Sequence, residues 1–361
     1  MSKIVAFFKK PFMRKYFNYI IVALVAVVFG ALSLAGTLKM GTQFLLEQIA
    51  IAVLLAVSLG MVVGFLGELS LGHAGFMCVG AYAGGKIAVL LTSALGVGDN
   101  NLIALILALV VGGVAAAIFG FIIGLPALRL RGDYLAIVTL AFGEIVRSVV
   151  MNLPAGFFGG TLGLATPRFK RQYLFVFAFV MVLACLAVTQ NLMRSKHGRA
   201  IIAIKDNEIA ARAMGVDVTK YKLFVFTVSS FFAGVAGALY SYTQARVQTS
   251  TFSYNYSIEI LVMVVLGGMG SINGSMLAAA LITFLNVKLQ TILTGNLAVL
   301  QKVIYALILI AIVIYRNAPG LKSFREKYNM NTLAAGLKRR LGGKRADAAP
   351  AAEQEVPVDE Q

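Results

Sequence analysis

The sequence predicts an all-α polytopic membrane protein with about eight to ten transmembrane helices, some of them broken at glycines. Hydrophobic residues make up 59% of the 361 residues and charged residues only 13%, whereas soluble domains average about 45–50% and about 25%. The mean hydropathy is +0.86, and the apolar residues gather in runs of roughly 20, the length that crosses a bilayer as a helix. These observations exclude a soluble enzyme with a polar surface all round, and also a collagen-like or disordered chain.

The apolar runs predict the spans in chain order. They lie at 18–38, 43–66, 69–91, 101–125, 133–152, 172–191, 222–243, 256–270, 275–293 and 297–315. The first run exceeds the apolar core of about 7–15 residues of a signal peptide, so it predicts a retained anchor. Within 256–293 the sequence leaves open one crossing or two, because the region is too long for one span and its first half is short for a full crossing.

Basic residues fall almost entirely between the spans, which predicts the orientation of the chain. Residues 1–17 predict a basic cytoplasmic N-terminus, 18–316 the transmembrane domain with a cytoplasmic loop at 192–222, and 317–361 a cytoplasmic tail that is disordered at its acidic end. Basic residues near Arg171 are an exception, because this topology puts them outside. Topology explains the net charge of +17 better than nucleic-acid binding does.

The sequence offers no catalytic, metal or nucleotide site. The two Cys lie inside apolar runs and the two His are far apart from each other, and no Ser/His, Asp/Asp or zinc-ligand set for an intramembrane enzyme stands out. The stretch Gly80–Lys86 has the spacing of a phosphate-binding P-loop, but Ile87 follows where Ser or Thr should bind magnesium. If ATP drives this protein, another chain binds it.

Two glycine-rich stretches, 67–75 and 266–275, interrupt apolar runs in the two halves of the chain. Such paired breaks are typical of discontinuous helices around a translocation path. The alternative is close helix packing, which also suits the pairs Gly60/Gly64, Gly80/Gly84 and Gly120/Gly124. The candidates for the path are Glu68, Ser70, Gly72, His73, Gly75, Gly267, Gly268, Gly270 and Ser271.

Few ionisable residues fall within the spans, and each is costly at mid-bilayer. Glu144 and Arg147 are three residues apart on one predicted helix, so we expect them to form a structural pair. Glu47, Lys86 and Glu259 should face protein or water, or lie nearer the interface.

The cytoplasmic segment 206–215 has the signals of a short helix. Asp206 or Asn207 can cap its start, Glu208 and Arg212 can pair, and Gly215 suits its end. Its apolar edge comprises Ile209, Ala210, Ala213 and Met214. A helix of two turns needs a surface to pack on, and the residues leave open whether this is the lipid headgroup layer or a groove on a cytoplasmic partner.

The segment 208–215 (Glu-Ile-Ala-Ala-Arg-Ala-Met-Gly) resembles the coupling loop of bacterial ABC-importer permeases, as do Tyr221–Phe224 and Phe232–Leu239 after it. More narrowly, the chain resembles the LivM family of branched-chain amino acid permeases over roughly residues 43–316. The matching blocks are Gly67–Phe76, Leu128–Arg147, Gly159–Gly163 and Leu266–Ser271. The resemblance implies the ABC-importer permease fold.

The resemblance also implies partners and roles. The partners would be two cytoplasmic ATPases that bind ATP and magnesium, a second, LivH-like permease and a periplasmic binding protein, in a bacterial inner membrane. The ATPase-coupling positions would be Asp206, Glu208, Ile209, Ala210, Ala211, Arg212, Met214 and Gly215. The glycines of both stretches, including Gly67, would shape the path or pack. Relatives that move urea or short amides, and an autonomous secondary transporter or channel, are the alternatives.

Overall fold

The computed structural model describes residues 11–36, 38–95, 101–130, 132–167 and 169–292, and the six separate residues Val303, Ile304, Ala306, Leu307, Ile310 and Ile314. The predicted last span, 297–315, therefore lies outside the described residues apart from these six, and the tail 317–361 lies wholly outside. The chain divides into two units, Met1–Ile292 and Leu293–Gln361. The described residues between 11 and 292 belong to the first unit.

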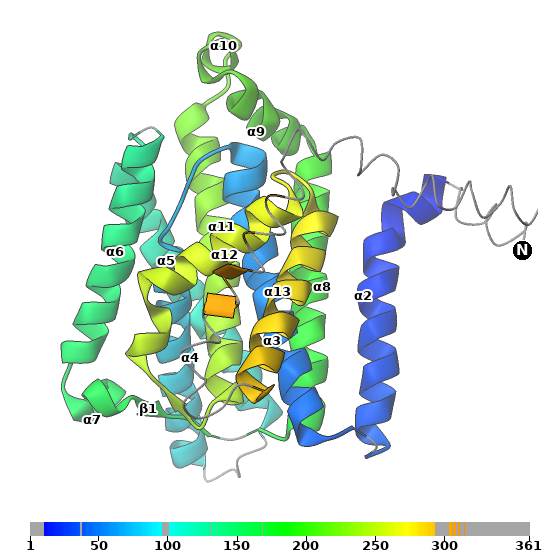
Figure 1. Ribbon diagram of the computed structural model, residues 1–361. Coiled ribbons are helices and arrows are strands. Elements are labelled where there is room, and N and C mark those ends of the chain that lie inside the picture. Colours follow the sequence, from blue (N-terminus) through cyan, green and yellow to red (C-terminus); the bar gives the residue numbers. More distant parts are fainter. Residues whose placement is uncertain are drawn as a thin grey trace, which may run out of the picture. The chain divides into compact units, whose positions relative to one another are not determined.

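The described part of this unit is nearly all helical (Figure 1). In order, its helices are α2 (Pro11–Leu34), α3 (Met40–Gly60) with a π-helical extension η1 (Met61–Leu66), α4 (His73–Leu95), α5 (Leu102–Ala127), α6 (Asp133–Asn152), α7 (Ala155–Phe158), η2 (Gly160–Leu162), α8 (Arg171–Arg194), α9 (Lys196–Asp206), α10 (Glu208–Ala213), α11 (Val218–Thr243), η3 (Thr249–Phe252), α12 (Tyr254–Gly267) and α13 (Ile272–Ile292). Two short strands, β1 (Leu164–Ala165) and β2 (Arg246–Val247), pair antiparallel with Leu164 opposite Val247.

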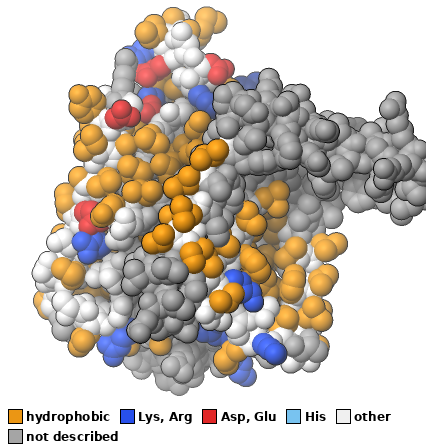
Figure 2. Space-filling view, viewed as in Figure 1, with side chains coloured by type: hydrophobic (Ala, Val, Ile, Leu, Met, Phe, Trp, Pro, Cys, Tyr) orange, Lys and Arg blue, Asp and Glu red, His pale blue; other side chains and the backbone are white. Residues whose placement is uncertain are grey.

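Seven helices of the described part are long and apolar enough to cross a membrane, which confirms the all-α polytopic prediction. They are Met40–Leu66, His73–Ser93, Leu102–Ala127, Asp133–Asn152, Tyr173–Arg194, Val218–Thr243 and Ile272–Ile292. Two shorter apolar helices, Val22–Ser33 and Tyr254–Gly267, accompany them. In Figure 2 hydrophobic side chains cover much of the visible face between the ends, and charged side chains lie mostly toward the ends.

The centre of the unit is formed by α11 packed against α4 and α5, with α3 beside them. Small residues let these helices approach closely, as is usual in membranes. A Cβ at Gly80 would overlap the backbone of Gly234, and one at Gly237 would overlap the carbonyl of Met77. Of the predicted small-residue pairs, Gly80/Gly84 lies in this contact. A Cβ at Gly124 would likewise come 2.7 Å from Leu223 Cδ1.

The predicted span 69–91 is wrong over its first residues, because 67–72 is not helical and α4 begins at His73. Glycine at both ends of this segment lowers its helix propensity. The backbone N–H of Leu71 donates instead to Thr139 Oγ1 on α6, at 3.0 Å. The chain therefore runs as an extended strap from η1 to α4.

The region 256–293 consists of a short helix and a long one. At 1.5 Å per residue, the 14 residues of α12 span about 21 Å, which is less than the roughly 30 Å of a hydrocarbon core. The 21 residues of α13 are enough for a crossing. Between the helices, Gly268 and Gly270 have φ angles of +99° and +86°, a conformation that favours glycine.

The ionisable residues of the spans lie against partners. Arg147 Nε donates to Glu144 Oε2 at 2.8 Å, which confirms the predicted pair, and Glu144 Oε1 accepts from the backbone N–H of Tyr254 where α12 begins. Glu47 is fully buried, 3.6 Å from Arg171, which also lies over the ring of Phe44. Arg171, which is an exception to the charge pattern of the loops, is thus the counter-charge of the buried Glu47.

The glycine contact predicts opposite effects of one substitution at two sites. Gly80→Ala should lower stability by about 1–3 kcal/mol because the new methyl group overpacks the contact with Gly234. Gly60→Ala should be neutral or stabilising by about 0.4–1 kcal/mol, since among the described residues nothing lies within 4 Å of its Cβ position and alanine restricts the unfolded chain. Thermal midpoints of the detergent-purified variants measure both. Equal midpoints would contradict the packing.

Candidate functional site

The predicted cytoplasmic loop 192–222 forms a chain of capped helices at one end of the unit, the end at the top of Figure 1. Ser195 Oγ accepts from Gly198 N–H at the start of α9, and Asn207 Oδ1 accepts from Ala210 N–H at the start of α10. Asp217 Oδ1 accepts from Lys220 N–H at the start of α11. These bonds satisfy helix donors that would otherwise lack partners, so the loop has a defined shape without a partner chain.

The short helix α10 confirms the predicted local structure. Asn207 rather than Asp206 is its cap, since Asp206 ends α9. Gly215 has a φ of +83°, and Val216 N–H reaches back to Ala211 O at 3.1 Å, as in a glycine-terminated helix. Of the apolar side chains, Ala211 is buried, whereas Ile209 and Met214 are 75% and 84% exposed. α10 thus presents an uncovered apolar edge.

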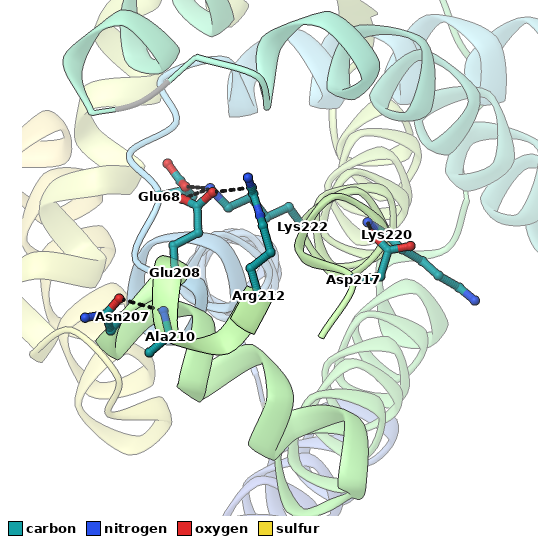
Figure 3. A network of polar contacts seen from close by, with 8 residues as sticks. All are labelled: Glu68, Asn207, Glu208, Ala210, Arg212, Asp217, Lys220 and Lys222. Atoms are coloured by element: carbon teal, nitrogen blue, oxygen red, sulfur yellow. Dashed lines mark hydrogen bonds and ion pairs between the residues drawn. The ribbon is translucent and has the colours of Figure 1, made fainter. Parts of the chain in front are cut away.

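A nearly buried cation ties α10 to the strap after η1 (Figure 3). Lys222 Nζ on α11 donates to Glu208 Oε2 at 3.1 Å and also contacts Glu68 Oε1. Arg212 Nη2 donates to the other Glu208 oxygen at 3.0 Å. The Lys222 side chain is only 4% exposed, so its charge depends on these carboxylates. Sequence reasoning missed Lys222, and it placed Glu68 in the path, whereas the structure places Glu68 beside Lys222 and Glu208 of α10.

The π-helix η1, which leads into the first glycine-rich stretch, meets the second stretch beside this network. Lys205 Nζ on α9 donates to the backbone carbonyl of Gly64 in η1 at 2.7 Å. A Cβ at Gly64 would lie 2.7 Å from the backbone nitrogen of Gly270, in the break between α12 and α13. The helix η1, directly before the break in the first half of the chain, is therefore in contact with the break in the second half and with the helix that leads to α10.

Most of the predicted path residues lie inside helix packing. His73 is buried, with its Nε2 2.8 Å from Ser58 Oγ, and Ser70 is buried as well. A Cβ at Gly72 or Gly75 would meet the backbone of α6, and one at Gly267 would meet Ser275. Of the break residues, Gly270 and Ser271 are exposed. The packing alternative fits the buried residues, and their role in a path stays a prediction.

Two adjacent cavities at the opposite end were not predicted. The first, of about 580 Å³, is lined by the start of α3, the residues before α8 and the end of α11. The second, of about 520 Å³, is lined by α3, α11, η3, α12 and α13. A signal for the second exists in the sequence: Thr283, Asn286 and Gln290 are spaced to share one face of a helix.

No group of three or more His, Cys, Asp or Glu in the described ranges is arranged to hold a metal ion. The P-loop-like stretch Gly80–Lys86 lies within α4, where the helix already uses the backbone N–H groups that a phosphate loop would present.

Comparisons with known proteins agree with the fold. The family described as "Branched-chain amino acid transport system / permease component" matches residues 41–313. The high-affinity branched-chain amino acid transport system permease protein LivM of Escherichia coli is 36% identical over 290 residues, 72% of this chain and 66% of that protein. A probable LivH permease of Methanocaldococcus jannaschii is 30% identical over 175 residues, 47% of this chain and 55% of that protein. The ribose import permease RbsC of Escherichia coli is 26% identical over 298 residues, 76% of this chain and 84% of that protein.

The match to LivM of Escherichia coli spans slightly less than two thirds of that protein. No solved structure matches this chain at a significant level. The family match takes in the glycine breaks, the capped loop and α3 to α13, and the chain therefore belongs to the permease component family of branched-chain amino acid transport systems.

Proposed function

We propose that this chain is the membrane-spanning permease subunit of an ATP-driven importer for branched-chain or related amino acids. It would work by alternating access, with no covalent chemistry of its own, and ATP and magnesium would bind to separate chains. The family and the relatives named LivM support the transport role. The observation that carries the coupling role is the Lys222 bridge between Glu208 on α10 and Glu68 in the strap.

The proposed partners are two cytoplasmic P-loop ATPases, a second LivH-like permease, a periplasmic binding protein and the surrounding lipid of a bacterial inner membrane. The exposed apolar edge of α10 fits a groove on an ATPase, because a solvent-exposed pair such as Ile209 and Met214 gains by burial. The basic residues of the loop 192–222 favour a cytoplasmic position for it and for both termini.

The network suggests how ATPase movement would reach the transmembrane part. A shift of α10 moves Glu208, and Lys222 must follow or lose one of the two carboxylates that compensate its nearly buried charge. Lys222 also holds Glu68, so the strap 67–72 moves with it. Lys205 provides a second link, through Gly64 to the break at Gly270. The coupling role of the remaining residues 206–215 rests on their place in or beside α10.

The proposed substrate class is inferred from the names of the relatives. LivM relatives are named for branched-chain amino acids and RbsC for ribose, so this permease architecture serves different solutes. An importer of urea or short amides is the alternative within the class. An autonomous secondary transporter or channel is the alternative outside it, and in that case α10 would lie on the headgroup layer.

Purification in mild detergent, with the tagged chain expressed at its native level, tests the proposal. Mass spectrometry should find one or two P-loop ATPases and a second glycine-rich permease in the complex. Recovery of the chain alone, stable and monodisperse, would contradict the importer and favour the autonomous transporter.

Glu208→Lys should preserve membrane insertion but lower both ATPase co-purification and L-leucine uptake by about tenfold, which corresponds to roughly 1.4 kcal/mol. The new cation would face Lys222 and Arg212 in place of the carboxylate that both now contact. Lys220→Glu is the matched control, since it reverses a charge at the same end and its side chain points away from the network (Figure 3). Unchanged uptake in Glu208→Lys would remove the coupling role of α10.

Lys222→Met and Glu68→Gln should each reduce uptake while the ATPases still co-purify, because the apolar edge of α10 stays in place. If one bridge carries the coupling, the double variant should be no worse than the single variants, with a coupling energy of about 0.5–3 kcal/mol between the two positions. Uptake measured in the four-member cycle decides this. If the fractional losses of uptake in the two single variants multiply in the double variant, the bridge does not transmit the movement.

A further inference from the structure

We propose that a zwitterionic aliphatic amino acid occupies the two adjacent cavities in turn. The first cavity binds its carboxylate, and the second binds its ammonium group and side chain. This inference rests on the proposed function and names the residues of this chain that the substrate would meet. The first cavity lies at the end of α3 and α11 opposite the coupling helix, where a solute delivered from outside would enter, and the second reaches from Gln244 to Ala52 in the middle of α3.

The first cavity is lined by cations and an unused hydroxyl. Lys170 and Arg171 both line it, and Arg171 is fixed in place by the ring of Phe44 and by Glu47. The hydroxyl of Tyr242, a residue only 5% exposed, finds no hydrogen-bond partner among the described residues. A guanidinium, an ammonium group and a hydroxyl are donors that suit a carboxylate.

The second cavity has the opposite character. Glu259 lines it, with one carboxylate oxygen accepting from Asn286 Nδ2 at 3.0 Å. Gln48, Asn286 and Gln290 supply further amide oxygens, and Thr283 Oγ1 is buried without a hydrogen-bond partner among the described residues. The described lining includes no lysine or arginine. Carboxylate, amide and hydroxyl oxygens suit an ammonium group.

The rest of the second cavity suits an aliphatic side chain. Ala52, Met263 and Val287 line it beside the polar residues. Its volume of about 520 Å³ falls within the range of roughly 300–1,000 Å³ of small-molecule sites, which combine an apolar lining with a few polar groups.

The cavities are neighbours in the fold and share a lining residue. Gln244 at the end of α11 lines both of them. Along α3, Gln43 lines the first and Gln48 the second, just over one helical turn deeper. Phe44 lines the second cavity and lies under the Arg171 guanidinium of the first. A solute that passes Gln244 and Phe44 therefore leaves a cationic compartment and enters an acidic one.

Cysteine labelling of the full chain in right-side-out membrane vesicles tests the proposal. Ala245→Cys reports on the first cavity and Gln290→Cys on the second, because both positions are exposed and line the cavities. Both native cysteines of the chain are fully buried, so background labelling should be low. The probes are an anionic sulfonatoethyl and a cationic trimethylammonioethyl methanethiosulfonate.

We expect Ala245→Cys to react about tenfold faster with the anionic reagent and Gln290→Cys about tenfold faster with the cationic one, as charged clefts concentrate opposite ions. L-Leucine should slow both reactions. 4-Methylpentanoate, which lacks the ammonium group, should slow only the first, and isopentylamine, which lacks the carboxylate, only the second. D-Ribose should slow neither.

Charge variants assign the effect to residues. Glu259→Gln should abolish the cationic preference at Gln290→Cys, and Glu259→Asp should keep it. Lys170→Gln should halve or abolish the anionic preference at Ala245→Cys. It is chosen over Arg171→Gln because the loss of Arg171 would leave the buried Glu47 carboxylate without its counter-charge. Equal rates of the two reagents, no labelling of Gln290→Cys, or no protection by L-leucine would overturn the proposal.

The labelling does not depend on ATPases, so the two proposals can fail separately. If the chain co-purifies without ATPases but shows the charge and protection pattern, the cavity assignment stands and the importer fails. If leucine uptake is driven by ATP but the pattern is missing, the importer stands and the substrate takes another route.

Discussion

The position of Lys222 between two acids is the interaction on which the cytoplasmic end of the structure depends. A nearly buried ammonium group is stable only while both carboxylates stay near it, so the strap after η1 is held to α10 and the first turns of α11, which are distant from it in sequence. Removing either acid would leave the cation with half its compensation.

Close backbone contacts at glycines are the second constraint, because they determine which helices can shift relative to one another. In the contact of α4, α5 and α11, backbones touch at Gly80, Gly112 and Gly234, and sliding one helix would drive side chains into another helix's backbone. By contrast, the contact of Gly64 with Gly270 joins segments that are not regular α-helix. The first contact suits a rigid centre, and the second suits a hinge.

The sequence predicts the features that depend on neighbours in the chain. Apolar run length predicts the spans, Asn207, Glu208 and Gly215 predict α10 with its cap and its end, and the spacing of Glu144 and Arg147 predicts their pair. Features that depend on distant partners were missed. Lys222 and Glu68 are 154 positions apart, and Leu71 finds Thr139 on another helix, so no local pattern announces either bond. The cavities were missed for the same reason, since five elements contribute to the second one.

These constraints together give the movement a direction. Because the glycine contacts resist motion within α4, α5 and α11, the displacement of α10 that the proposed mechanism requires would be taken up at η1, the strap and the break between α12 and α13. Both α12 and α13 line the second cavity, and Lys205 reaches their break through Gly64. A change at the coupling end can therefore alter the shape of the cavity at the opposite end without repacking the rigid centre, which is the requirement that alternating access places on a permease.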